Sequence, residues 1–390
     1  MNINSNFVEN LVAVDPRKLY EELQSDDRPN FDTYWRVQNE LKPVDLYCYL
    51  YARFGPANGF QNFLRGDHSE NLIHWEWALS SNGRILLVQG HNFRTEVWVS
   101  GEELSQDNLN QLIEEMKATY PKYGEEMGKV RRALEHWIEF INPYKRIKNS
   151  IDSLVKELEA LDIPNQATEF KSVAEYSDPE SWSKDWGHQA EIITRATGLC
   201  FGIRSMLPVM AEAFVNLLLY MLMKPELKAD DRLRENIIRQ PIDVRVKSLS
   251  HNCVGFETVI DYSHDACRRY HSLVNERNDL LHGNVVVDKL KFNELYFNGR
   301  VPVFQTYDSM WGRAFGVAKM SVGLDLLDEE RKAVREFINY LISCLNERNQ
   351  ESVLAFSESR DLGICLDDGH MGMLFSNQLV DMVPGPRATD

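Results

Sequence analysis

The chain has 390 residues, of which 43% are hydrophobic and 26% are charged; this composition is typical of a folded protein of two or three domains and excludes disordered and collagen-like classes. Its 43 Lys and Arg residues against 59 Asp and Glu residues give a net charge of −16. A protein that coats nucleic acid with its whole surface is therefore excluded, because phosphate binding requires an excess of basic side chains.

Signals for export or membrane insertion are lacking in the sequence. The N-terminal residues have neither the basic region nor the apolar core of a secretory signal, and the six cysteines are widely spaced. Such spacing is typical of reduced thiols, so we expect a cytoplasmic protein. The longest apolar run, residues 213–223, is shorter than the roughly 20 residues that cross a bilayer. It predicts a buried core helix, and we expect no membrane partner.

Residues 1–124 predict an N-terminal α+β domain. Helical patterning is followed by residues 72–79 and 84–88, in which apolar side chains recur with a period of two. Asn82-Gly83 between these runs is a strong hairpin signal. With a further strand after them, we expect a small antiparallel β-meander at residues 71–100.

Three tryptophans of this meander have two interpretations. Trp75, Trp77 and Trp98 can pack across the strands in a core, or they can stack on nucleic-acid bases. Core packing is the favoured interpretation, because aromatic side chains on alternating positions are typical of a buried sheet face.

The rest of the chain is mainly helical, so the expected fold class is mainly α, or α+β overall. Residues 125–162 predict a long helical segment, broken or kinked near Pro143. Residues 163–189, rich in Ser, Asp and Gln, predict a linker. Residues 190–350 predict a helical bundle, and residues 351–390 are interpreted as a C-terminal tail.

The most informative motif is Glu-Arg-Asn-Asp-Leu-Leu-His-Gly-Asn at residues 276–284, at the end of a helix that we expect to begin near Thr258. Gly283 predicts the C-cap, since a left-handed backbone costs glycine little. Arg277 and His282 then lie in the last turns. Their simplest role is to complement the helix dipole.

These side chains also suit metal-independent cleavage of RNA. An imidazole can remove the 2′-OH proton or protonate the leaving 5′ oxygen, and the Arg277 fork can bind the scissile phosphate. Asn278 shares a helix face with His282 and can orient the imidazole or donate to phosphate. Because one His cannot easily be both acid and base, we expect two chains to combine their sites across a two-fold axis.

The pattern Arg-Asn-x-x-x-His-Gly at a helix end resembles the R-x4–6-H signature of HEPN (higher eukaryotes and prokaryotes nucleotide-binding) domains, which are compact helical bundles common in bacterial toxins and phage-defence ribonucleases. The resemblance covers roughly residues 190–350 and implies that Arg277, Asn278 and His282 form an active site at a dimer interface. Its other helices would be residues 206–223, 233–249 and 327–345. The first 190 residues resemble no family that we can name.

The Arg–His spacing alone is weak evidence for this resemblance, because other Arg–His pairs in the chain have a similar spacing. The context of Arg277 and His282 distinguishes them: a polar Asn follows the Arg, an apolar pair precedes the His, and a helix-ending Gly follows it. The pairs with similar spacing are Arg131–His136, Arg245–His251 and Arg84–His91.

Further residues are weaker candidates. Arg268, Arg269 and His271, upstream on the same helix, are candidate substrate-binding residues that form a phosphate track, although a solvated surface explains them nearly as well. Glu212, with Asn216 four residues later, is a candidate supporting residue that would hydrogen-bond toward the motif helix, or a satisfied polar pair inside the bundle.

The segment Asp367-Asp368-Gly369-His370 suggests a metal site, but a turn is the favoured interpretation because no second group of ligands accompanies it. We expect no metal and no cofactor.

The leading hypothesis is a homodimeric HEPN endoribonuclease in a toxin–antitoxin or anti-phage system, with RNA as substrate and an antitoxin or a phage-derived trigger protein as a further partner. The alternative is a non-catalytic helical module for dimerisation or for binding protein or RNA. A third hypothesis is a metal-dependent enzyme that uses the C-terminal tail.

Overall fold

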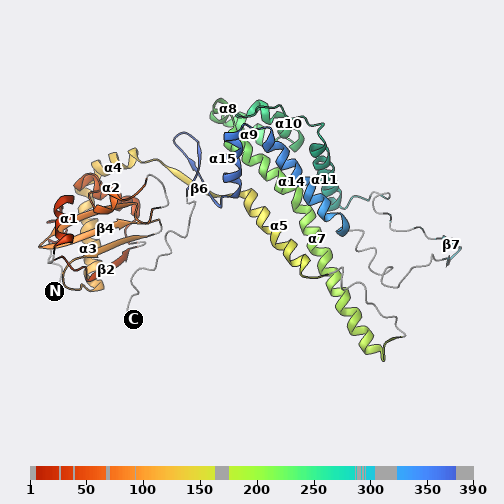
Figure 1. Ribbon diagram of the computed structural model, residues 1–390, viewed down its shortest axis with the longest axis horizontal. Helices are drawn as coiled ribbons and strands as arrows, with labels where there is room; N and C mark the ends of the chain where they lie inside the picture. Colours follow the sequence, from red (N-terminus) through yellow and green to blue (C-terminus); the bar gives the residue numbers. More distant parts are fainter. Residues whose placement is uncertain are drawn as a thin grey trace. The chain divides into compact units, whose positions relative to one another are not determined.

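The computed structural model is an α+β structure in which helices predominate and the sheets are small and antiparallel (Figure 1). It divides into two compact units, one of Met1–Glu139 with Gly363–Asp390 and one of Phe140–Leu362. The structure describes residues 6–25, 28–37, 40–66, 71–92, 94–162, 175–285, 287, 291, 294, 296–303 and 323–374.

The first unit is a sheet with helices on both faces. Leu19 of α1 packs on one face, and α2 and α3 cover the other. Its elements are β1 (Val12–Ala13), α1 (Pro16–Gln24), β2 (Thr33–Val37), α2 (Pro43–Phe54), η1 (Phe60–Phe63), β3 (Trp75–Ser81), β4 (Arg84–Gly90), β5 (Thr95–Val99), α3 (Gln106–Thr119), η2 (Tyr120–Tyr123), α4 (Gly124–Ala133) and β10 (Met371–Met373), with β6 (Trp137–Ile141) and β9 (Asp361–Cys365) at its boundaries.

The expected meander at residues 71–100 is confirmed as β3, β4 and β5. Asn82 and Gly83 have φ values of 51° and 79°, the left-handed conformation that a tight hairpin turn requires. β1 and β2, which the sequence did not reveal, complete a five-stranded sheet in the order β1-β3-β4-β5-β2. Trp77 is fully buried and donates from Nε1 to the Gly55 carbonyl at 3.2 Å, so its role is core packing.

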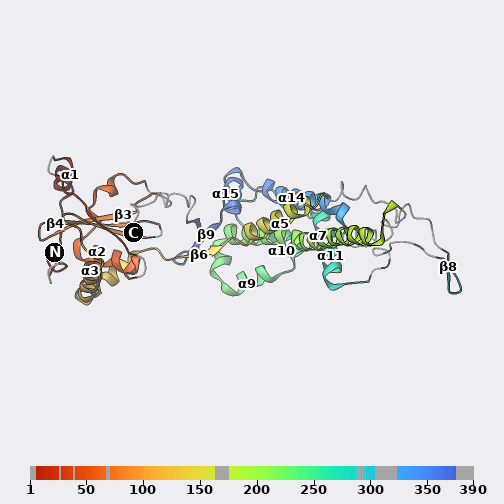
Figure 2. The same cartoon turned by 90° about the horizontal axis from the view of Figure 1, so that it is seen from below.

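The second unit is a helical bundle around one long central helix, α7 (Figure 2). Packing of α5, α10, α11, α14 and α15 against α7 buries one continuous core, in which Tyr270 and Phe337 stack with ring centroids 4.1 Å apart. Its elements are α5 (Pro143–Glu159), α7 (Pro179–Leu222), α8 (Pro225–Ala229), α9 (Asp231–Arg239), α10 (Ile242–Asn252), α11 (Asp265–His282), β7 (Tyr296–Asn298), β8 (Val301–Val303), η4 (Leu324–Leu326), α14 (Leu327–Ser343) and α15 (Glu347–Glu358).

Local signals at prolines correct two of the expected boundaries. The expected break of segment 125–162 near Pro143 is confirmed, because Pro143 is the first residue of α5 and the Asn142 side chain caps it. The segment is not helical throughout, however, because the strand β6 separates α4 from α5. The linker 163–189 is wrong from Pro179 onward, because Asp178 caps α7 at that point; residues 163–174 lie outside the described part.

Three further expectations change in detail. The expected helix 233–249 is two helices, α9 and α10, interrupted at Pro241. The motif helix begins at Asp265, with His264 as its N-cap, and not near Thr258. The C-terminal tail contains the end of α15 and the strands β9 and β10, which form a sheet in the order β10-β9-β6.

α7 contains the apolar run that was expected to form a core helix. Over the described residues it is the one helix long and apolar enough to cross a membrane by length and composition, and 61% of its most apolar 18-residue window is buried inside the protein. Leu218, Leu219 and Val215 in this run are fully buried against the other helices of the bundle.

Candidate active site

The end of α11 has the geometry that the motif predicts. Gly283 adopts φ 62° and ψ 34°, and its backbone N–H bonds to the Asp279 carbonyl. Asn284 donates to the same carbonyl at 3.0 Å. The left-handed cap therefore ends the helix directly after His282, and the imidazole lies at the exit of the bundle helix.

Arg277 continues the buried stripe of α11. Cys267, Tyr270 and Val274 face the core at alternating spacings of three and four residues, and Arg277 occupies the next position of this series. Its Nε is inaccessible to solvent and has no acceptor, and no hydrogen bond or ion pair joins its guanidinium to the described residues. A half-buried cation is thus held at the end of the core without a partner among the residues that the structure describes.

Asn278 and His282 lie on a neighbouring face of the same helix. Asn278 is partly exposed and His282 is exposed, and within the described ranges neither side chain makes a hydrogen bond. Donor and acceptor groups of both are therefore free to contact a ligand. Leu281, the next residue of the apolar stripe, is 47% exposed, and Val285 beyond the cap is 81% exposed.

Glu212, the carboxylate expected to support the motif, binds a residue of a different helix. Glu212 on α7 forms an ion pair with Arg245 of α10, and Arg245 also donates to Asn216. The expectation that Glu212 and Asn216 hydrogen-bond toward the motif helix is therefore wrong, and the satisfied polar pair is the correct interpretation. The partner, Arg245, was visible in the sequence only as one member of a weak Arg–His pair.

Tyr270 joins this polar cluster to the motif helix. Its hydroxyl donates to the Pro208 carbonyl of α7 at 3.2 Å. Burial raises the pKa of Tyr270 and nearby Glu212 adds to the rise, while Arg245 and Arg277 oppose it. The hydroxyl therefore stays protonated and remains a hydrogen-bond donor inside the bundle.

A second ion pair fixes the acidic residue of the motif. Arg204 of α7 donates from Nε to the Glu330 carboxylate of α14 at 2.9 and 2.8 Å, and its Nη2 lies 3.5 Å from the Glu276 carboxylate. Burial alone would lower the pKa of Arg204, but its hydrogen bonds to the Glu330 carboxylate and the negative charge of Glu330 raise the pKa overall. These contacts link α7 and α14 to α11 at Glu276, the residue before Arg277.

The candidate phosphate track is occupied by local contacts. Arg269 forms ion pairs with Asp265 and with Glu336 of α14, and Arg268 lies 3.8 Å from Asp265. His271 shares a hydrogen bond of 3.2 Å with the Tyr262 hydroxyl. These contacts favour a structural role, and substrate binding by Arg268, Arg269 and His271 stays a prediction without support from the geometry.

The structure also separates the motif from the pairs of similar spacing. α4 ends at Ala133, so Arg131 and His136 do not share a helix, and Arg131 pairs with Asp45. Arg245 and His251 do share α10, but Arg245 is buried in its ion pair with Glu212. Arg277 and His282 are the pair that one helix presents together at its end.

Comparison of the chain with models of known protein families, with curated protein sequences and with solved structures finds no match. The resemblance to HEPN domains therefore rests on the motif and its position at the end of a bundle helix.

Proposed function

We propose that the protein is a metal-independent endoribonuclease of the HEPN type, with Arg277, Asn278 and His282 as its catalytic residues. One observation carries the proposal: Arg277 is held at the end of the core with a buried Nε and no partner in the described residues, beside two side chains that make no hydrogen bond to those residues. A buried guanidinium nitrogen without an acceptor is costly unless a ligand satisfies it. An RNA phosphate supplies the missing charge and acceptors.

In the reaction, the Arg277 fork binds the non-bridging oxygens of the scissile phosphate and stabilises the charge that grows on them. His282 acts as acid or base on the 2′-OH or on the leaving 5′ oxygen, and Asn278, one helical turn away, orients the imidazole or donates to phosphate. The products are a 2′,3′-cyclic phosphate and a 5′-OH end.

The second proton transfer requires a second histidine, which a two-fold related copy of the chain supplies. Leu281 and Val285 favour this arrangement, because both are exposed apolar residues adjacent to His282. Placed on a dimer interface, they bring two copies of the motif together. The biological setting that we propose is a toxin–antitoxin or anti-phage system, with an antitoxin or phage-derived protein as regulator.

Local charge is compatible with an RNA substrate. Residues 224–300 contain thirteen Lys and Arg residues and twelve Asp and Glu residues, whereas the whole chain carries −16. A nearly neutral region around the motif admits RNA, while the acidic remainder repels it at longer range. We therefore propose low basal RNA affinity outside this region. We also propose cytoplasmic localisation, because the widely spaced cysteines are typical of reduced thiols.

The test is cleavage of total tRNA and of an mRNA by the purified protein with EDTA present. The wild type is expected to release 2′,3′-cyclic phosphate ends, and His282→Ala and Arg277→Ala to release none. The double variant Arg131→Ala/His136→Ala has the same spacing outside the site and is expected to cleave normally. Absence of EDTA-resistant cleavage by the wild type, or equal cleavage by all variants, contradicts the proposal and favours the non-catalytic helical module.

The dimer is tested separately with Leu281→Glu. Because this side chain is 47% exposed, the substitution leaves the bundle folded but places a charge in the proposed interface. Sedimentation is expected to show a monomer, and cleavage is expected to fall. Leu233→Glu on α9, where the leucine is 48% exposed, is the matched control and should remain dimeric and active.

A further inference from the structure

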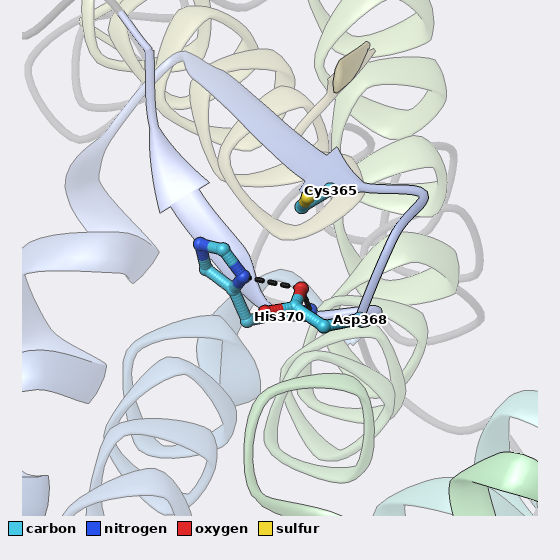
Figure 3. A group of neighbouring side chains, drawn as sticks. All are labelled: Cys365, Asp368 and His370. Carbon is cyan, nitrogen blue, oxygen red and sulfur yellow. Dashed lines mark hydrogen bonds and ion pairs between the residues drawn. The ribbon is translucent and has the colours of Figure 1, made fainter. Parts of the chain in front are cut away.

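The β9–β10 hairpin brings together four potential metal ligands within six residues. Cys365 ends β9, and Asp367, Asp368 and His370 follow it before β10 begins. Figure 3 shows three of these side chains, those of Cys365, Asp368 and His370. The turn is closed by hydrogen bonds from Cys365 N to the His370 carbonyl at 2.9 Å and from Gly369 N to the Cys365 carbonyl at 2.8 Å. Gly369 has φ 72°, a conformation that permits this tight return.

The ligand atoms of three of these residues lie close enough to share one ion. Cys365 Sγ, a carboxylate oxygen of Asp368 and a ring nitrogen of His370 all lie within 4.8 Å of one another. Asp367 adds a fourth donor, because its Oδ2 lies 3.7 Å from Cys365 Sγ. Bond lengths of about 2.0–2.3 Å to zinc place tetrahedral ligands roughly 3.5 Å apart. The Cys365–Asp367 separation already fits this value.

Closing the remaining separations requires movement of about 1 Å, given those zinc bond lengths. The side chains of Asp368 and His370 are 62% and 51% exposed, so they can move without disturbing a core, whereas Cys365 is buried and fixed. The turn can therefore collapse onto an ion that the thiol anchors.

We propose that Cys365, Asp368 and His370 bind a divalent transition metal of the zinc class, with Asp367 or water as the fourth ligand. The donor set supports this class: a thiolate and an imidazole favour zinc over calcium and magnesium, which prefer oxygen ligands alone. The sequence alone favours a turn here because no second group of ligands accompanies the segment, but Cys365 completes the spacing Cys-x-x-Asp-x-His and supplies a further ligand.

A turn alone does not account for the whole group. The backbone N–H of His370 bonds to Asp368 at 3.0 Å, which explains an aspartate at that position. The imidazole also bonds to the Asp368 carboxylate through Nδ1 at 2.5 Å (Figure 3), and the Cys365 thiol donates to Asp367 Oδ2 at 3.7 Å, which are contacts that closing the turn does not require. The Trp137 ring meets the His370 ring edge to face at 4.7 Å and limits its orientation, as the shell around a metal ligand does.

Two other cysteines, Cys253 and Cys267, are buried in the core of the helical bundle. Burial raises the pKa of Cys253 and of Cys267 to about 12, so both remain protonated thiols. Over the described residues, the cluster at Cys365 is the one place where a cysteine belongs to a group of potential metal ligands. The cysteines elsewhere therefore provide controls for binding at this site.

The experiment uses the full-length reduced protein, stripped with chelator and reloaded with Zn²⁺ or Co²⁺. We expect one metal per chain by elemental analysis, and a thiolate-to-cobalt charge-transfer band in the near-ultraviolet spectrum. Cys365→Ser is expected to lose this band, and His370→Gln to bind zinc at least about tenfold more weakly in competition with a chromophoric chelator. Cys344→Ser, at a buried cysteine outside the group, should bind as the wild type does.

Asp368→Asn distinguishes a role in metal binding from a role in the turn. Asparagine still accepts the hydrogen bond from His370 N, so the turn persists, but the ligand charge is lost and zinc affinity is expected to fall. Because His370 and Asp368 are exposed, their variants stay folded and report binding directly. Lack of stoichiometric metal in reloaded wild-type protein, or equal affinity in all variants, overturns the proposal. The proposed RNA cleavage in EDTA does not depend on this outcome.

Discussion

Two arginines of the bundle, Arg245 and Arg277, have opposite environments. Arg245 is buried, and its terminal nitrogens bind Glu212 and Asn216, although its Nε lacks an acceptor. Arg277 has no hydrogen bond or ion pair to the described residues. Both lie near the Tyr270 hydroxyl and influence its pKa in the same direction. The bundle thus contains one guanidinium on α10 that a carboxylate neutralises, and one on α11 that has no carboxylate partner among the described residues.

The contrast indicates which of the two guanidinium groups stabilises the fold. A buried ion pair with its hydrogen bonds made is a structural feature, and breaking it leaves a charge without compensation. An unpaired guanidinium at the open end of the core contributes nothing comparable to folding. Its retention there is explained by a ligand, which we propose to be RNA phosphate. The following predictions test this difference.

The largest effect is expected for His282→Ala. Loss of a general acid or base typically lowers a rate by about 10²–10⁴-fold, and the exposed imidazole makes no contact within the described structure that folding would miss. Single-turnover cleavage of RNA in EDTA is the measurement, and thermal unfolding is its control. A large fall in melting temperature would show that His282 serves the fold instead.

Glu212→Ala should produce the largest loss of stability. It leaves the Arg245 side chain, which is 7% exposed, without its carboxylate, at a cost of about 3 kcal/mol in the free energy of unfolding. Urea denaturation measures this cost. Glu212→Gln keeps an acceptor and should lose less. A loss below about 1 kcal/mol in Glu212→Ala would mean that the pair is no more valuable than a surface salt bridge.

A smaller and pH-dependent effect is expected at an exposed ion pair between α15 and α5. Burial raises the pKa of Glu358, but hydrogen bonds from Lys145 and Lys148 outweigh it, so the pKa is lowered from 4.5. A carboxyl with a lowered folded pKa stabilises above its unfolded pKa, and this stability is lost as pH falls below about 4.5. Glu358→Gln should cost less than about 1 kcal/mol at pH 7 and nothing at low pH.

The smallest effect on stability is expected for Arg277→Met. The substitution keeps the aliphatic part of the side chain and removes an unpaired buried Nε, so the free energy of unfolding should stay within about 0.5 kcal/mol of the wild type or rise. Cleavage should be abolished in the same protein. A strong destabilisation, measured by urea denaturation, would place Arg277 with Arg245 among the structural residues.

Local signals in the sequence were sufficient for the β-meander, the apolar character of α7 and the cap of the motif helix. Asn82-Gly83 fixes its hairpin because both residues accept positive φ, and Gly283 ends α11 for the same reason. Such features depend on a few adjacent residues. Helix starts were misjudged where a cap and a following proline, as at Asp178-Pro179, mattered more than hydrophobic periodicity.

What only the tertiary structure decided is which polar groups meet. The sequence placed Arg277, Asn278 and His282 on one helix end, because their spacing and the glycine cap are local. It could not show that Glu212 pairs with Arg245, which lies 33 residues away on another helix, or that Arg277 Nε has no acceptor among the described residues. It likewise did not bring Cys365 to His370, since hairpin closure sets that distance. Pairing of buried charges depends on how helices pack, and one sequence specifies that packing only through the fold as a whole.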